Sequence, residues 1–198
     1  MIKLPDVTLV CIDCKYYVHA AKAIMKSIEK IEFNKVLFLT DIPFVKHPKL
    51  VEIKNILPIK NKLEYSYFVI NQLVDYIKTS HFLVIQYDGF VINPELWNND
   101  WLNYDYIGAP WWYEERNVGN GGFSLRSLRS SKIVKEIAGK NCHPEDDYIC
   151  RTLRPQLEKK GIKFAPEEVA EKFSIELNAK HPIFKNDTFG FHGLNLIR

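Results

Sequence analysis

Residues 81–89 read His-Phe-Leu-Val-Ile-Gln-Tyr-Asp-Gly. The run from His81 to Ile85 is short and almost wholly apolar, which is typical of a strand buried on both faces of a parallel sheet. Asp88 comes where this strand would end, and open α/β sheets bind their ligands at the carboxyl ends of their strands. The stretch therefore predicts an α/β protein and makes Asp88 a candidate binding residue. The alternative is that Asp88 and Gly89 only form a turn.

Further strands are predicted before this one, alternating with helices. Apolar runs at 7–12 and 36–39 end at Asp13 and at Thr40-Asp41, and 51–53 is a weaker third strand. Helical spacing predicts an apolar helix face made of Val18, Ala21, Ile24, Met25, Ile28 and Ile31, and a second helix over 64–78. This alternation predicts a Rossmann-like, mostly parallel central sheet with helices on both faces.

Composition excludes several classes of protein. The 198 residues are 46% hydrophobic, enough for a sizeable core. The net charge of +3 and the pI of 8.5 are too mild to indicate a nucleic-acid-binding protein. No apolar segment approaches the roughly 18 residues of a membrane span, and no signal peptide is recognisable. We therefore expect a soluble, cytoplasmic protein.

The four cysteines do not form a recognisable metal or disulfide pattern. Cys11 and Cys14 have the spacing of half a zinc site, but Cys142 and Cys150 do not supply the second half. Cys11 also falls within the first predicted strand, where a free cysteine is common. The cysteines are therefore expected to be reduced.

The amino-acid composition changes after residue 90. Four tryptophans lie between 97 and 112, and glycines gather between 108 and 122. A short strand is predicted at 123–126 and a late one at 173–176, with helical spacing at 133–137 and 148–157. No linker interrupts the chain, so one domain is expected over 1–198. Its front half, about 1–92, would bind a nucleotide, and its back half, about 93–198, would carry the acceptor and catalytic groups.

Two segments of the back half have the composition of a binding site. Gly119-Asn-Gly-Gly122 allows backbone to approach a ligand closely and to direct N–H groups at a sugar or phosphate. It is not a Walker loop, because no Gly-Lys-Ser/Thr follows; a flexible turn is the alternative. Glu145-Asp146-Asp147 could supply a carboxylate that takes a proton from a hydroxyl, although Pro144 followed by acids is also an ordinary helix start.

Histidine and tryptophan side chains complete the candidate set. His192, between glycines in Phe189-Gly-Phe-His-Gly193, is an accessible candidate metal ligand, and His143 is a weaker one. Trp111 and Trp112 precede the glycine loop and are favoured to stack on a sugar. Trp97 and Trp101 are expected in the core.

The order and spacing of these motifs resemble those of a known family. The motifs are Gln86-Tyr-Asp-Gly89, Tyr104–Trp112, Gly119–Arg126, Pro144–Asp147 and Phe189–Gly193. Together they resemble a family of short, mostly uncharacterised glycosyltransferase-like proteins, similar to enzymes of the type-A glycosyltransferase fold. The resemblance runs from about residue 6 to residue 194 and is most specific in the back half.

The resemblance implies a nucleotide-sugar donor and a divalent metal, Mn²⁺ or Mg²⁺. The type-A fold carries an Asp-x-Asp motif whose last acid binds the metal, and Asp88 matches that acid by position. Gln86 stands where the first acid is usual, so it brings no charge. His192 matches the histidine metal ligand that many such enzymes carry near the end of the domain, and the affinity for metal would depend largely on it.

The resemblance also implies roles around the metal. Comparison with the β-1,4-galactosyltransferases makes Glu145 the acceptor-holding residue and Asp146 the base of an inverting reaction. Asp13, Tyr65 and Ser66 match places where the fold contacts the nucleotide. Gly121 and Gly122, with Gln86, would line the donor site.

The leading hypothesis is a metal-dependent transferase that moves a sugar from a UDP-sugar to the hydroxyl of a glycan or another acceptor. Two rival hypotheses remain open. A sugar-phosphate nucleotidyltransferase would share the front half, but it usually has a glycine-rich loop after the first strand, where residues 11–15 contain no glycine. A non-catalytic carbohydrate- or nucleotide-sugar-binding protein of the same fold would be consistent with Gln86 in place of an acid.

Overall fold

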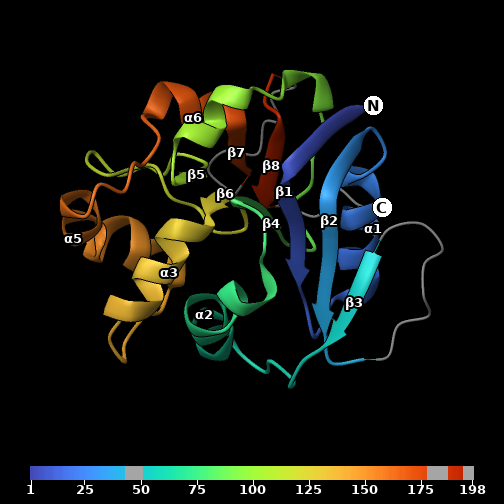
Figure 1. Cartoon of the computed structure of the whole chain (residues 1–198), viewed down its shortest axis with the longest axis horizontal. Coiled ribbons are helices and arrows are strands. Elements are labelled where there is room, and N and C mark those ends of the chain that lie inside the picture. The colour runs from blue at the N-terminus through green and yellow to red at the C-terminus, as the bar shows by residue number, and fades with distance from the viewer. Residues whose placement is uncertain (43–50, 178–186, 194–198) are drawn as a thin grey trace.

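A six-stranded sheet crosses the whole molecule (Figure 1). The computed structural model describes residues 1–42, 51–177 and 187–193. The strands are β1 (Ile2–Ile12), β2 (Ile31–Thr40), β3 (Val51–Asn55), β4 (His81–Ile85), β5 (Tyr106–Gly108) and β6 (Phe123–Ser127), in the order β3-β2-β1-β4-β6-β5. β1 to β4 are parallel, and β6 runs antiparallel to both of its neighbours. The prediction of an α/β fold with a mostly parallel sheet is confirmed.

The remaining elements are short helices and a second, two-stranded sheet. The helices are α1 (Tyr17–Ser27), α2 (Lys62–Asn71), α3 (Leu128–Ile137), α4 (Glu145–Asp147), α5 (Arg154–Lys159) and α6 (Glu167–Phe173). Three 3₁₀ turns, η1 (Leu73–Tyr76), η2 (Pro94–Leu96) and η3 (Asn99–Asn103), and one π-helical turn, η4 (Tyr148–Thr152), connect them. β7 (Ser174–Leu177) and β8 (Gly190–Gly193) pair in parallel beside the main sheet.

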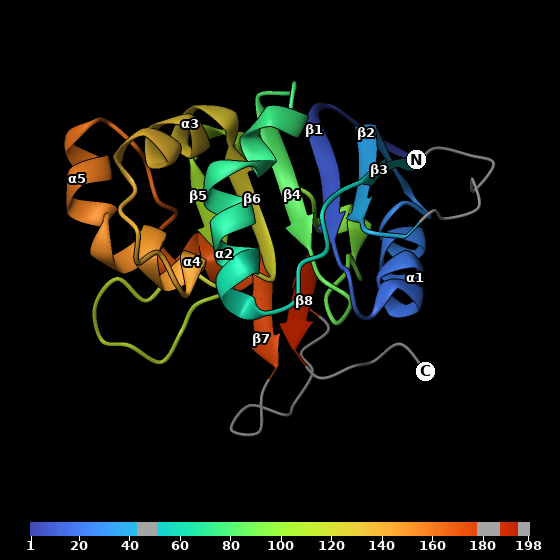
Figure 2. The same cartoon turned by 90° about the horizontal axis from the view of Figure 1, so that it is seen from below.

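Alternate residues of the central strands pack on opposite faces, as the period of a strand requires. Leu9 and Cys11 of β1 pack in the cluster that contains the buried side of α1. Val10 and Ile12 pack in the cluster that contains Phe68 of α2. Helices therefore cover both faces, and Figure 2 shows α2 and α3 in front of the sheet.

The buried side of α1 differs from the predicted apolar face. The side chains that face the sheet are Ala20, Ala23, Ile24 and Ser27. Val18 and Met25, which were predicted to be buried, are 52% and 38% exposed. Three of the buried side chains are small or polar, so hydrophobicity alone does not identify them. Ser27 is satisfied in the core because its hydroxyl donates to the carbonyl of Ala23 at 2.9 Å.

The second predicted helix is also shorter than expected. α2 begins at Lys62, where the Asn61 side chain accepts from the backbone N–H of Glu64 at 2.9 Å, and the Glu64 carboxylate accepts from the N–H of Lys60 at 2.8 Å. It ends at Asn71, ahead of η1, and Ile77 is extended. The apolar pattern continues across this break because η1 also buries Leu73 and Val74, so periodicity predicted one helix where there are two elements.

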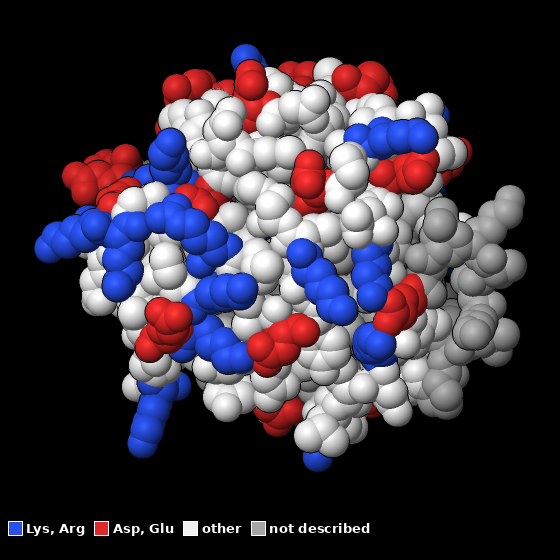
Figure 3. Space-filling model, viewed as in Figure 1, with Lys and Arg blue, Asp and Glu red and all other residues white. Residues whose placement is uncertain are grey.

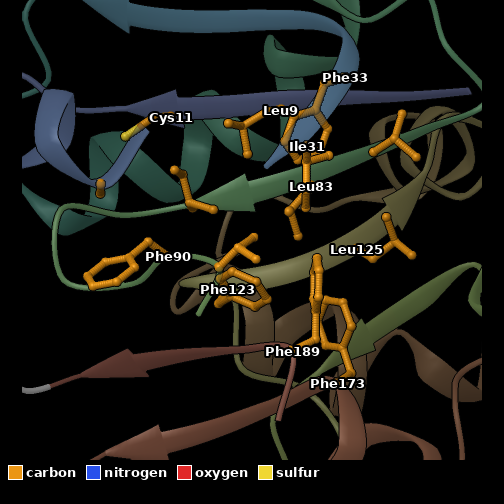
Figure 4. Close-up of a cluster of buried hydrophobic side chains, with 14 of the residues drawn as sticks. Leu9, Cys11, Ile31, Phe33, Leu83, Phe90, Phe123, Leu125, Phe173 and Phe189 are labelled. Carbon is orange, nitrogen blue, oxygen red and sulfur yellow. The ribbon is translucent and has the colours of Figure 1, made fainter. Parts of the chain in front are cut away.

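An aromatic cluster joins the β7–β8 pair to the main sheet. Phe123 of β6 packs against Phe173 and Phe189, with ring centroids 5.3 and 5.9 Å away, and Figure 4 shows these rings together between the strands. Trp97 and Trp101 also pack on Phe189, each at 5.4 Å, which confirms their predicted core position. The cluster fixes where β8 lies, although no periodic pattern in the sequence predicts that strand.

The structure also bears on the cysteines, on membrane-spanning helices and on surface charge. Cys11, Cys14, Cys142 and Cys150 are free thiols in the structure. In the described part of the chain, no helix combines the length and the apolar character needed to cross a bilayer. Lys and Arg side chains are numerous on the face seen in Figure 3, with Asp and Glu between them.

Candidate functional site

A cavity of about 530 Å³ opens at the carboxyl ends of the central strands, within the usual size range of ligand sites. Segments that follow β1 and β4 form one part of its wall, and the start of the antiparallel β6 lies at the same edge. The lining residues are Ile12–Tyr16, Ile59–Lys62, Tyr65, Ser66, Gln86, Tyr87, Gly121, Gly122, His143–Asp146 and His192. The site therefore lies where an open α/β sheet binds ligands.

A second cavity of about 650 Å³ adjoins the first and shares Ile59 and His143 with it. Its walls are largely apolar. Its single carboxylate, Glu64, is engaged in capping α2. The carboxylates that could act on a ligand are therefore concentrated in the first cavity, although the second cavity is larger.

An imidazole and two carboxylates lie together at one side of the first cavity. His192 Nε2 is 3.4 Å from Asp88 Oδ1 and 3.1 Å from Gln86 Oε1. His192 Nδ1, on the opposite edge of the ring, is 2.9 Å from Glu176 Oε2. Burial disfavours a charged imidazole, but the hydrogen bonds and charges of Asp88 and Glu176 outweigh it and raise the pKa of His192 to about 10.

Asp88 and His192 form a donor set that fits a divalent cation. Asp88 Oδ1 is buried and has no hydrogen-bond partner among the described residues; the cationic group nearest to it there is the His192 imidazole, 3.4 Å away. A divalent cation at this position would neutralise the carboxylate in place of the imidazole proton. Oxygen and imidazole nitrogen are suitable ligands for Mn²⁺, and Mg²⁺ at phosphate-binding sites usually takes one or two protein carboxylates plus phosphate oxygens. Among the described residues, no three His, Cys, Asp or Glu side chains converge on one metal position. The protein would therefore supply a partial set, completed by the ligand.

Gly122 leaves the space that the imidazole occupies. A Cβ built on Gly122 would lie 2.1 Å from His192 Nε2, far inside contact distance. Gly121 likewise leaves space for the acidic pair, Glu145 and Asp146. A Cβ built on Gly121 would lie 2.6 Å from Glu145 Oε1 and 3.0 Å from Asp146 Cβ. Two successive glycines thus separate the cation side of the cavity from the acidic side.

Glu145 is buried on the acidic side. It is 6% exposed and faces the guanidinium of Arg126, which is 3% exposed, at 3.4 Å. Burial raises the pKa of Glu145, and the charge of Asp146 raises it further, while Arg126 opposes both. Arg126 also donates to the carbonyl of Gly121 at 3.3 Å and to the Ser124 hydroxyl at 2.9 Å. This buried pair therefore holds the glycine loop in place.

Asp146 is half-buried and held by backbone. Its Oδ2 accepts from the N–H of Gly121 at 2.9 Å, and its Oδ1 accepts from the N–H of Asp147 at 2.9 Å. A carboxylate fixed in this way at the cavity wall has the placement that a general base needs. The acids also lie in the first turn of α4, where the helix dipole favours negative charge.

Another part of the cavity wall is formed by Asp13 and an aromatic pair. Asp13 Oδ1 accepts from the N–H groups of Lys15, at 2.7 Å, and Tyr16. Burial raises the pKa of Asp13, although these hydrogen bonds oppose the shift. The rings of Tyr16 and Tyr87 lie 4.4 Å apart and form an aromatic surface beside it. The Tyr65 hydroxyl accepts from Gln86 Nε2 at 3.0 Å.

The structure brings together most of the residues predicted for the site. The lining includes Asp13, Tyr65, Ser66, Gln86, Gly121, Gly122, Glu145, Asp146 and His192, and also His143, whose Nδ1 is 2.9 Å from the Ser66 hydroxyl. Asp88 lies behind the lining and contacts it through His192.

Trp111 and Trp112 are placed differently from the prediction. Neither is among the lining residues, and Trp112 is 64% exposed. The Trp111 ring fills the space beside Gly119, where a Cβ would lie 2.1 Å from it. Proximity in sequence to the glycine loop therefore does not bring either ring into the cavity.

Sequence reasoning missed Glu176, Arg126, Tyr16 and Tyr87. The two tyrosines directly follow strands whose ends were recognised, so their place at the sheet edge could have been inferred. Glu176 and Arg126 are members of predicted strands and gave no separate signal. Their roles depend on which segments pack beside them.

Comparisons with known proteins bear on the family and on the fold. The family described as "Protein of unknown function (DUF5672)" matches residues 49–192. No curated protein matches the sequence.

Several solved glycosyltransferases share the fold at low sequence identity. A glycosyltransferase involved in glycosylation of the major capsid of PBCV-1 is 16% identical, with a TM-score of 0.57 over 94% of this chain and 91% of the other. A mannosyltransferase from Pyrobaculum calidifontis, solved with GDP-Man and Mn²⁺, is 9% identical, with a TM-score of 0.54 over 84% of this chain. The glycosyltransferase GlyE of Streptococcus pneumoniae is 13% identical, with a TM-score of 0.51 over 85% of this chain. This chain spans 57% of the mannosyltransferase and 46% of GlyE. The chain therefore has a glycosyltransferase fold.

Proposed function

We propose that this chain, which belongs to the DUF5672 family of unknown function, is a metal-dependent glycosyltransferase of the type-A fold. It would transfer a sugar from a nucleotide diphosphate, with UDP favoured, to an acceptor hydroxyl. One observation carries the proposal: the cavity is lined by His192, which Asp88 contacts from behind, and by the acidic pair Glu145 and Asp146, with only two glycines between them.

Asp88 and His192 are the residues that would hold Mn²⁺ or Mg²⁺. When bound, such a cation neutralises the diphosphate as the glycosidic bond breaks. Gln86 lies beside both residues and brings no charge, so the affinity for metal rests on one carboxylate, one imidazole and the donor's phosphates.

Asp146 is proposed as the base. The acceptor oxygen attacks the anomeric carbon, its proton passes to the Asp146 carboxylate, and the nucleoside diphosphate leaves with the electron pair of the broken bond. One displacement of this kind inverts the anomeric centre. Glu145 would hold the acceptor from beside the base, with its carboxylate oriented by Arg126.

Asp13, Tyr65 and Ser66 would contact the nucleotide: all three line the cavity, Asp13 beside the Tyr16–Tyr87 pair and Ser66 with its hydroxyl 3.5 Å from Glu145 Oε2. Gly121 and Gly122 would allow the donor sugar to lie against backbone. Trp111 and Trp112 have no part in the proposal, because neither lines the cavity.

Incubation of the protein with Mn²⁺ and a panel of UDP- and GDP-sugars tests the proposal through release of free nucleotide, with and without added acceptor sugars. We expect release with at least one donor, loss of release in EDTA, and a higher melting temperature with UDP and Mn²⁺. Absence of both release and thermal shift with every donor would overturn the proposal. Pyrophosphate production from a nucleoside triphosphate would instead indicate a nucleotidyltransferase.

Replacement of Gly122 by alanine should damage the cation side of the cavity. The new methyl would lie 2.1 Å from His192 Nε2, so either the imidazole or the loop must shift. We expect Mn²⁺ affinity to fall by about 10-fold or more, the lower bound for disturbing the surroundings of a metal ligand. Gly139→Ala is the matched control, because its Cβ would meet only the Tyr148 hydroxyl, at an ordinary 3.5 Å. Equal Mn²⁺ affinity in the two variants would contradict the assignment of His192.

A further inference from the structure

Glu176 lies directly opposite His192 in the register of the β7–β8 pair. Neighbouring residues of paired strands present their side chains on one face, so the register itself brings the carboxylate to the imidazole. Glu176 Oε2 is 2.9 Å from His192 Nδ1, and both side chains are largely buried. No other acceptor contacts Nδ1 among the described residues.

Asn120 holds Glu176 from the other side. Its side-chain Nδ2 donates to Glu176 Oε2, and its Oδ1 accepts from the N–H of Gly122 at 3.2 Å. Asn120 has a backbone φ of +24°, a conformation that asparagine tolerates better than most residues. The glycine loop therefore supports the carboxylate as well as leaving space for the imidazole.

Glu176 is placed on the wrong edge of the ring to bind the same cation as Asp88. Asp88 and Gln86 face Nε2, whereas Glu176 faces Nδ1. When a cation binds Nε2, one ring proton remains, and Glu176, a carboxylate that can only accept, holds that proton at Nδ1 so that the lone pair of Nε2 is directed at the cation. Carboxylates that hold metal-binding histidines in this manner fix the ring and increase its basicity.

We propose that Glu176, supported by Asn120, is a positioning residue that fixes His192 with Nε2 directed at the cation site beside Asp88. The inference rests on the proposed function, because it presupposes a divalent cation at that site. Glu176 acts through His192 alone and does not contact the cation.

Binding of Mn²⁺ alone tests the inference without any donor or turnover. Free Mn²⁺ is titrated by electron paramagnetic resonance with wild type, Glu176→Ala, Glu176→Gln, His192→Ala and the Glu176→Ala/His192→Ala double variant. Glu171→Ala is the matched control, since it removes the same charge from an exposed position on α6. Electron spin echo spectra of the bound ion report whether an imidazole nitrogen is coordinated.

We expect Glu176→Ala to weaken Mn²⁺ binding by about 10- to 100-fold and to weaken the nitrogen coupling. Glu176→Gln, whose amide oxygen still accepts from Nδ1–H, should lie between this variant and wild type, and it covers the case in which the alanine variant does not fold. The double variant should bind no more weakly than His192→Ala, because two residues that act through one contact are not additive.

Three results would overturn the inference. Wild-type affinity and nitrogen coupling in Glu176→Ala would show that the carboxylate does not position His192. Additive losses in the double variant would show that Glu176 acts on the cation independently of the ring. No Mn²⁺ binding by wild type would overturn both this inference and the metal dependence of the proposed function, whereas the first two results leave the latter intact.

Discussion

Asp146→Asn should lower the rate of sugar transfer by about 10²- to 10⁴-fold, the usual contribution of a general base. Asparagine has nearly the same shape, and its amide oxygen can still accept from the N–H of Gly121, so the loop should keep its conformation. It cannot take the proton of the acceptor hydroxyl. The rate constant should therefore fall while the KM for the donor and the thermal shift with UDP and Mn²⁺ stay at wild-type values.

Asp147→Asn is the matched control for this experiment. Asp147 is the next residue of α4, carries the same charge, and pairs with Arg151 at 3.3 Å outside the cavity lining. Its rate should remain within about twofold of wild type, because exposed ion pairs contribute little. If Asp146→Asn transfers sugar as fast as Asp147→Asn, Asp146 is not the base. If wild type itself binds donor without turnover, the chain is a binding protein of the same fold.

Asp88→Asn should abolish metal-dependent donor binding. The substitution keeps the volume of the side chain but replaces a buried, unpartnered carboxylate oxygen with a neutral group. Loss of the single carboxylate of the cation site should weaken Mn²⁺ binding by more than about 100-fold, since removal of an outer-shell partner alone costs 10- to 100-fold. Calorimetric titration with Mn²⁺, and then with UDP at saturating Mn²⁺, measures both effects.

Asp100→Asn provides the control, because it makes the same chemical change at an exposed residue of η3. The far-ultraviolet circular dichroism of both variants should match that of wild type. Mn²⁺-dependent UDP binding that persists in Asp88→Asn at wild-type affinity would refute the cation site, and the metal dependence would then need other ligands.

The main sheet could be predicted from sequence because its central strands are buried on both faces. Val7–Ile12, Val36–Leu39 and His81–Ile85 are apolar except for Thr8 and His81, and each lies within β1, β2 or β4. β8 could not be predicted in this way. It has four residues, two of them glycine, and becomes a strand only through its pairing with β7 and the burial of Phe191.

The residues of the candidate site differ in the same way: local sequence could place some of them and could not place others. Asp13 and Asp88 follow recognisable strands, so their place at the sheet edge follows from local pattern. The partnership of Glu176 with His192 depends on the register between two strands that the sequence does not specify. Likewise, Arg126 reads as one residue of a short strand, and only its burial beside Glu145 gives it a role.

The β7–β8 pair has a further consequence for the proposed cation site. The pair carries both Glu176 and His192 but is not a member of the six-stranded sheet, so its opening would not break the strand pairing of the main sheet. A cation held at His192 opposes that opening, and each tenfold excess over its dissociation constant adds about 1.4 kcal/mol to the free energy of opening. The amide hydrogens of β8 should then exchange with solvent more slowly as Mn²⁺ is added, while those of β1 do not change. Cation occupancy and the local order of this pair are in effect a single equilibrium.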